Sequence, residues 1–67
     1  MMVQLLRERF VSGTKVLLHE MAGEKHMHDG LKGVVRFVDD IGQIHVQWEN
    51  GSRLALHYDE DSFEVIE

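Results

Sequence analysis

The segment from Gln43 to Trp48 alternates polar and apolar residues at every step, and a turn sequence stands on each side of it. Ile44, Val46 and Trp48 make up the apolar half, and a period of two is typical of a half-buried β-strand. Asn-Gly follows at residues 50–51, and this pair between two alternating runs favours a β-hairpin with a type I′ turn. A chain with this feature is constrained to build its core from antiparallel strands.

Other segments have a similar strand-like pattern, and turn residues separate them. Asp39-Asp40-Ile41-Gly42 is a turn sequence, with Asp suited to the start and Gly to a left-handed position. Residues 21–31 are predicted to form a long polar loop, and residues 57–62 a short 3₁₀ turn. Beside Gln43–Trp48, the predicted strands are 14–20, 32–38, 53–56 and 63–66.

A single helix is predicted, over residues 3–10 at the start of the chain. Leu5, Leu6 and Phe10 are expected to share one apolar face, with the charged residues between them outside. About two turns of helix are not stable alone in water. This segment must therefore either dock on the strands or fray.

Five short strands with tight turns are typical of an all-β fold, and we expect a five-stranded SH3-like small barrel with a short N-terminal helical segment. Residues 1–12 form the helical or frayed segment and residues 13–67 the barrel. The sheet is expected to close or nearly close, because an open sheet of this size would leave two edges exposed. The predicted core is Val16, Leu18, Val35, Phe37, Ile44, Val46, Trp48, Leu54, Leu56, Phe63 and Val65.

Length and composition limit the classes of protein to which the chain can belong. Sixty-seven residues make one domain, and the absence of cysteine excludes disulfides and thiolate metal sites. The first ten residues carry three charges and no apolar run of signal-peptide length, and no window approaches the length of a membrane span. We expect a cytoplasmic protein that does not associate with membranes.

The net charge of −5 is distributed unevenly along the chain. Residues 1–36 carry a charge of +2 and residues 37–67 a charge of −7, so the second half would repel nucleic acid. A local basic strip remains in the first half, and nucleic-acid binding is therefore kept as the alternative to the main hypothesis. The strip consists of Lys15, Lys25, Lys32 and Arg36.

One cluster has the side chains to bind a metal, in the sequence His26-Met27-His28-Asp29. In an extended segment His26 and His28 lie on the same side, and with Asp29 and either His19 or Glu24 they are candidate ligands for Zn²⁺ or Ni²⁺. A solvated polar loop is the favoured interpretation, because no second ligand pair has a recognisable spacing. The acidic runs 39–40 and 59–61 lack the spacing of an EF-hand loop.

No set of residues predicts catalysis. His57 beside Tyr58 and Asp59 resembles a base with its orienting group, but no motif places a nucleophile with them. The serines stand at turn or cap positions, which is their structural use. We expect neither an enzyme nor a cofactor.

Three stretches of the sequence resemble a family of short bacterial and phage proteins that is catalogued as a domain of unknown function. They are G-T-K-V-L-L at 13–18, V-D-D-I-G-Q-I-H-V-Q-W-E-N-G-S-R-L-A-L at 38–56 and F-E-V-I at 63–66. The resemblance implies a compact SH3-like barrel of undetermined role, often encoded near mobile elements, and supplies no catalytic residues. Residues 21–31 depart from the proline-containing loop of that family. The spacing of Gly30, Gly33 and Val35 is also similar to KOW-type barrels of ribosomal and transcription proteins.

The main hypothesis is a non-catalytic interaction module that binds a protein segment or another copy of itself. Tyr58 is the best aromatic anchor, because it follows a strand and stands among acids that favour a basic or mixed partner. Trp48 is a second candidate anchor, although core packing is favoured for it. Met27 belongs to an adaptable apolar rim with Met21 and Leu31. The candidate partner-binding residues are Tyr58, Trp48, Met27, Asp59 and Asp61.

Overall fold

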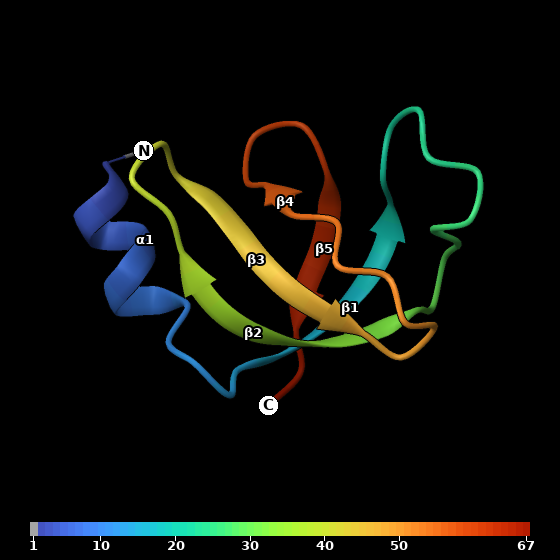
Figure 1. The fold of residues 1–67 in the computed structure, drawn as a ribbon, viewed down its shortest axis with the longest axis horizontal. Coiled ribbons are helices and arrows are strands. Elements are labelled where there is room, and N and C mark those ends of the chain that lie inside the picture. Colours follow the sequence, from blue (N-terminus) through green and yellow to red (C-terminus); the bar gives the residue numbers. More distant parts are fainter. Residues whose placement is uncertain (1) are drawn as a thin grey trace.

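The computed structural model describes residues 2–67, which form one short helix and a five-stranded antiparallel sheet (Figure 1). The strand order is β4-β3-β2-β1-β5, so β4 and β5 are the two edges. The predicted barrel is therefore not closed by backbone hydrogen bonds. The elements are α1 (Val3–Arg9), β1 (Lys15–Glu20), β2 (Lys32–Val38), β3 (Gln43–Trp48), β4 (Leu56–His57) and β5 (Ser62–Val65).

Four of the predicted strands agree with observed strands to within one residue, and the strand predicted at 53–56 does not. Only Leu56 of that segment belongs to β4. The backbone of Leu54 bonds to side chains and not to the backbone of β3. The indole Nε1 of Trp48 donates to the Leu54 carbonyl at 2.9 Å, and the Leu54 amide donates to Ser52 Oγ at 3.2 Å. Leu54 is consequently 39% exposed and not part of the core.

Both hairpin turns of the sheet have one left-handed residue, a glycine. After β3 the Trp48 amide donates to the Ser52 carbonyl and the Gly51 amide donates to the Trp48 carbonyl, each at 3.0 Å. Between β2 and β3 the Asp39 amide donates to the Gln43 carbonyl at 3.0 Å, and the Gly42 amide donates to the Asp39 carbonyl at 3.1 Å. No non-glycine residue in the described part of the chain has a positive φ. The predicted type I′ turn at 50–51 is therefore wrong, since it needs a positive φ at both central residues, and a three-residue loop takes its place.

A β-bulge in β2 changes which side chains enter the core. The register passes from Val35 opposite Val46 to Phe37 opposite His45, so one extra residue is inserted. Val38 thereby becomes buried, whereas Phe37 is 54% exposed, contrary to the predicted core.

The outermost part of the predicted core is also more open than expected. Val65 pairs with the buried Val16 but lies on the edge strand, where nothing continues the sheet, and it is 48% exposed. Phe63 is half-buried for the same reason.

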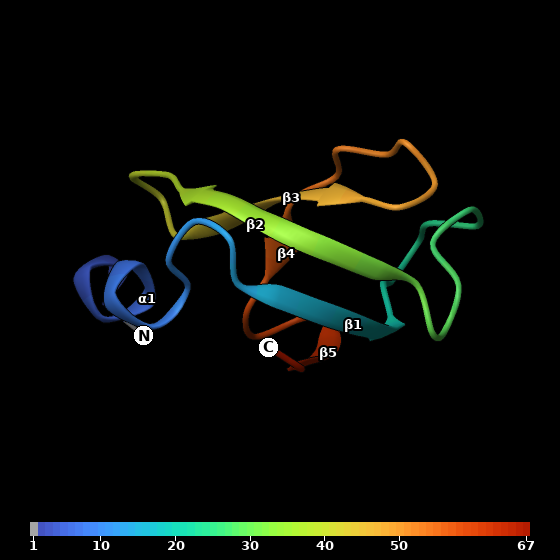
Figure 2. The ribbon, with the colours of Figure 1, turned by 90° about the horizontal axis from the view of Figure 1, so that it is seen from below.

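The segment 21–31 is not merely a polar loop, because it contributes three buried side chains to the core: Met21, Met27 and Leu31. The Leu18 amide donates to the Leu31 carbonyl at 2.8 Å, which extends the β1–β2 ladder into the loop. This loop and α1 lie at opposite ends of the sheet, as both views show (Figures 1 and 2).

The N-terminal segment docks on the sheet instead of fraying. Leu6 and Phe10 are 3% and 2% exposed, whereas Leu5 is 49% exposed and does not share their face. Arg7 Nε donates to the Val38 carbonyl at 3.2 Å, which fixes the helix to the end of β2. No helix of residues 2–67 has the length and hydropathy that crossing a membrane requires. Met1, the first residue of the predicted 1–12 segment, lies outside the described residues.

Candidate functional site

A groove of about 730 Å³ runs along the outer edge of β5, between this strand and the end of α1. The residues that line it come from three places: the last turn of the helix, the turn between β4 and β5, and β5 itself. They include three of the predicted partner-binding residues, Tyr58, Asp59 and Asp61. The full lining is Arg9, Phe10, Tyr58, Asp59, Glu60, Asp61, Ser62, Phe63, Glu64 and Val65.

Three aromatic rings form the floor of this groove. The Phe10 ring centroid lies 6.1 Å from that of Tyr58 and 5.8 Å from that of Phe63, and the Tyr58 and Phe63 rings meet edge to face. Arg9 Nη1 donates to the Tyr58 hydroxyl at 3.5 Å. Tyr58 and Phe63 are both half-buried, so each ring keeps an accessible part. The cluster is a preformed apolar surface in which the aromatic anchors lose little conformational freedom on binding.

The rim of the groove is acidic. Asp59 and Glu60 are exposed, and within residues 2–67 neither side chain has a hydrogen bond or ion pair; Glu64 is exposed too, and its Oε1 lies 3.8 Å from His19 Nε2. Asp61 differs, because its Oδ2 accepts a 2.8 Å bond from the His57 amide and so stabilises the turn between β4 and β5. Asp59 and Glu60 are thus available for a partner, Glu64 has one long contact with His19, and Asp61 stabilises the turn.

The free edge of β5 offers backbone groups along the same groove. The Ile66 amide donates to the Lys15 carbonyl at 2.9 Å, so the amide of residue 66 faces β1. Adjacent residues of a strand direct their amides to opposite sides, and the amides and carbonyls of Phe63 and Val65 therefore face away from β1. No strand of residues 2–67 pairs with this side of β5. Sequence reasoning missed this edge, because the order of strands in the sheet cannot be read from alternation.

Trp48 and Met27 take no part in this groove. Trp48 is 2% exposed and Met27 4% exposed, and both side chains lie in the hydrophobic core. Trp48 is buried because Ile44, Val46 and Trp48 all point to one face of β3, which is the core face. Met27 is buried because the loop turns inward, a conformation that its polar composition does not reveal.

Three of the four residues of the predicted basic strip line a second groove, of about 710 Å³, on the outer face of the sheet. Lys15, Lys32 and Arg36 come together there because β1 and β2 are paired and these side chains alternate outward. Lys25 lies in the loop and does not line that groove. Arg53, which the sequence did not single out, joins Arg36 in an adjoining hollow of about 260 Å³.

The residues considered for a metal are exposed and do not converge. Asp29 Oδ1 lies 3.2 Å from His19 Nδ1, and His28 Nδ1 contacts the backbone carbonyl of Asp29 at 2.9 Å. His26 is exposed in the same loop. Within residues 2–67, no group of three or more histidine, aspartate or glutamate side chains has the arrangement of a metal site.

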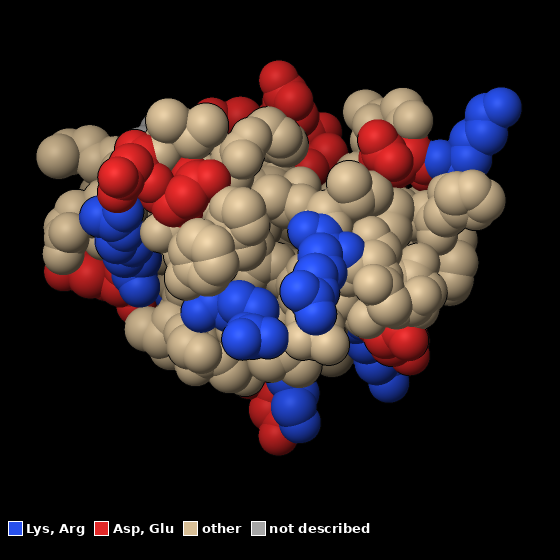
Figure 3. All heavy atoms as spheres, viewed as in Figure 1, with Lys and Arg blue, Asp and Glu red and all other residues tan. Residues whose placement is uncertain are grey.

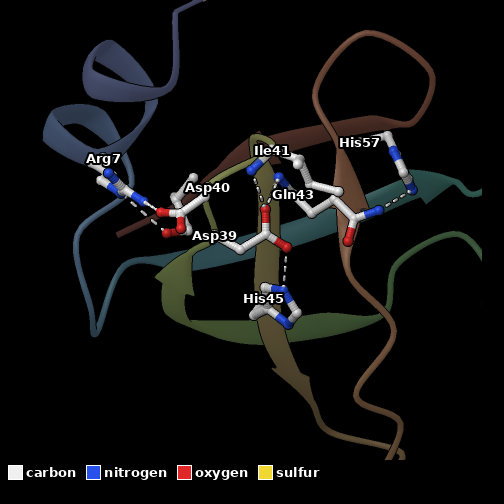
Figure 4. A network of polar contacts seen from close by, with 8 residues as sticks. Arg7, Asp39, Asp40, Ile41, Gln43, His45 and His57 are labelled. Atoms are coloured by element: carbon white, nitrogen blue, oxygen red, sulfur yellow. Dashed lines mark hydrogen bonds and ion pairs between the residues drawn. The ribbon is translucent and has the colours of Figure 1, made fainter.

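The most connected polar group of the molecule is the Asp39 carboxylate, at the turn between β2 and β3 (Figure 4). Its Oδ1 accepts bonds from the Ile41 amide at 3.1 Å and the Gln43 amide at 2.9 Å, and its Oδ2 lies 2.8 Å from His45 Nε2. The bond to His45 is the main reason why the pKa of Asp39 is lowered from its usual value of 3.8. Asp40 beside it pairs with Arg7 at 2.6 Å. These contacts define a turn and not a binding site.

Comparison with known proteins places this sequence in a family. No curated protein and no solved structure matches the chain. Residues 1–66, nearly the whole sequence, match the family described as Domain of unknown function (DUF4314). The chain therefore belongs to this family of short domains whose function is unknown.

Proposed function

We propose that this protein is a non-catalytic interaction module, an SH3-like barrel whose β5 edge binds an extended basic segment of a partner protein. The observation that carries the proposal is the coincidence of three features along one edge: outward-facing backbone amides, an aromatic floor and an acidic rim. Strand addition uses backbone groups for affinity and side-chain surfaces for specificity. This edge offers both.

The charge of the edge selects among partners. A lysine or arginine of an added strand would lie beside Asp59, Glu60 or Glu64, and complementary charges accelerate encounter and suppress wrong partners. A second copy of β5 would instead bring like charges together, with Glu64 of each copy on the shared edge. A basic partner strand is therefore favoured over pairing between two copies at this edge.

The backbone component of the proposal is tested with Val65→Pro and Val65→Ala. The probe is a short synthetic peptide of alternating lysine and valine, and binding is measured by titration calorimetry at low salt. Proline at 65 removes an outward amide without removing a bond to β1, and prolines are tolerated on edge strands for this reason. We expect Val65→Pro to abolish binding and Val65→Ala to retain most of it. Equal binding by the two variants would contradict strand addition.

The side-chain component is tested with Tyr58→Ala and with the double variant Asp59→Asn, Glu64→Gln. We expect each to weaken binding of the same peptide by about five- to thirtyfold, which corresponds to about 1–2 kcal/mol. The matched control is the double variant Glu8→Gln, Glu24→Gln, which removes two exposed acids that do not line the groove. If the control weakens binding as much as the double variant in the groove, net charge and not the groove attracts the peptide, and the proposal fails.

A further inference from the structure

The outer face of the sheet carries an exposed aromatic ring that the proposed function does not use. Phe37 is 54% exposed because the β2 bulge turns it outward, and its ring stacks on His45 with centroids 4.3 Å apart and planes inclined by 8°. Bulges often redirect a side chain at a functional site. Stacking on His45 holds this large apolar side chain in one orientation with part of its surface in water.

Two arginines lie in the hollow beside this ring. Arg36 and Arg53 line the hollow beside Phe37 and His45, and within residues 2–67 neither guanidinium has a carboxylate within 4.0 Å. Arg36 Nη1 donates to Gln47 Oε1 at 2.9 Å, which holds that side chain over the sheet. Lys32 continues the positive charge along the adjoining groove, where Lys15 is paired with Glu67 at 3.4 Å. Figure 3 shows positive side chains near the centre of the face on which β3 lies, and acidic ones along its upper edge.

The acidic residues near this face are already engaged. Asp39 contacts His45 and two backbone amides, Asp40 pairs with Arg7, and Glu49 accepts a 2.7 Å bond from the Lys32 amide. The residues of this hollow and those of the β5 groove do not overlap. The net charge of −5 thus conceals a face where cations are available to a ligand.

We infer that this outer face, centred on Phe37 and flanked by Arg36 and Arg53, binds single-stranded nucleic acid. A base would stack on the accessible surface of Phe37, while the two arginines contact flanking phosphates and Lys32 contacts the next phosphate along the strand. Proteins that bind single strands combine such cations with aromatic stacking. An acidic peptide would satisfy the arginines but offers Phe37 no extended planar partner, and a duplex would keep its bases out of reach of the ring.

Fluorescence anisotropy of a labelled short oligodeoxythymidine, titrated with the whole chain at low salt, tests the inference. We expect Phe37→Ala to weaken binding by about five- to 150-fold, the range for loss of one base stack. We expect Phe37→Trp, which keeps an aromatic ring at this position, to bind as well as the wild type. Unchanged circular dichroism of both variants, and an unchanged emission spectrum of the buried Trp48 in Phe37→Ala, would show that they fold. Absence of binding by the wild type at low salt, or equal binding by Phe37→Ala, would overturn the inference.

Charge is tested with a matched pair. Arg53→Gln and Lys25→Gln each remove one positive charge, but only Arg53 lies beside Phe37. We expect Arg53→Gln to weaken binding and to lower the slope of log affinity against log salt by about 0.7, and Lys25→Gln to leave both nearly unchanged. Equal effects of the two variants would overturn the inference in favour of nonspecific attraction. Poly-glutamate that binds as tightly as the oligonucleotide, with no dependence on Phe37, would overturn it in favour of an acidic protein partner.

Discussion

Gly33 is needed for its lack of a side chain and not for an unusual backbone angle. It is the second residue of β2 and lies opposite Trp48. A Cβ at this position would lie 2.7 Å from Trp48 Cε3 and closer still to Val46 Cγ1, and both of those side chains are buried. The largest side chain of the core therefore occupies space that any other residue at 33 would fill. The sheet can curve over its core here because the glycine leaves room for the indole.

Gly33→Ala is expected to overpack the core. Inserting a methyl group into a well-packed interior costs about 1–3 kcal/mol, and for a domain of this size 1 kcal/mol lowers the melting temperature by about 4–8 °C. Thermal denaturation followed by circular dichroism measures the loss. Val34→Ala, at the neighbouring outward-facing position, serves as the control and is expected to change little. A melting temperature of Gly33→Ala within a degree of the wild type would show that Trp48 can move aside.

Asp39 makes stability depend on pH, and the sign follows from its lowered pKa. Because the folded chain favours the ionised carboxylate, chiefly through the bond to His45, the contribution is present above the unfolded pKa of 3.8. It is lost as the pH falls through the lower, folded value. Asp39→Asn keeps an oxygen acceptor for the Ile41 and Gln43 amides but cannot ionise.

The urea midpoint of the wild type is therefore expected to fall more steeply than that of Asp39→Asn between about pH 5 and pH 2. The emission of Trp48, the one tryptophan of the chain, reports unfolding. Glu24→Gln controls for the loss of one carboxylate elsewhere on the surface. Parallel curves for the wild type and Asp39→Asn would mean that this carboxylate contributes nothing to acid sensitivity.

At the scale of the elements, local patterns predict most strands but not how adjacent strands are offset. Alternation in 43–48 identifies β3 because each residue of a regular strand faces opposite to the last. The same rule fails at Phe37, because the bulge depends on how β2 pairs with β3 and leaves no local signal. It fails at 53–55 because side chains of Ser52 and Trp48 compete for the backbone.

The residues of the candidate site also divide into those that local patterns predict and those that only the pairing of strands reveals. Tyr58 and Asp59 were predictable from the sequence. They follow the predicted strand at 53–56, and an aromatic residue among acidic residues at that place indicates an exposed, charged turn. Phe63 and Glu64 were not assigned to the site, since their role depends on β5 being an edge. Arg53 was likewise missed, because only the folded sheet brings it beside Phe37. Charge and side-chain type are local properties, whereas a surface combines residues that are distant in the sequence.

The molecule as a whole closes its sheet with side chains and not with backbone bonds. β4 and β5 do not pair, and the space between the sheet and α1 is filled by Leu6 and Phe10, with Phe10 packed against Tyr58 and Phe63. A helix of seven residues has little stability of its own, so it exists because this face is buried. The sheet in turn depends on the helix to cover core side chains that water would otherwise reach.

This mutual dependence predicts that helix and sheet unfold as one unit. Phe10→Ala should cost about 3–5 kcal/mol, which is a large part of the roughly 3–10 kcal/mol available to a chain of this length. Phe10→Leu, which keeps most of the buried volume, is expected to lose less and remain folded, and Leu5→Ala on the exposed side of α1 should change stability by less than about 0.5 kcal/mol.

Urea unfolding of Phe10→Leu is followed by far-ultraviolet circular dichroism and by Trp48 emission. Coincident transitions at a lower urea concentration than in the wild type are expected, because loss of the packing at Phe10 weakens the whole molecule. A Trp48 transition that stays at the wild-type midpoint while the helical signal disappears earlier would show that α1 is an appendage to a sheet that folds without it.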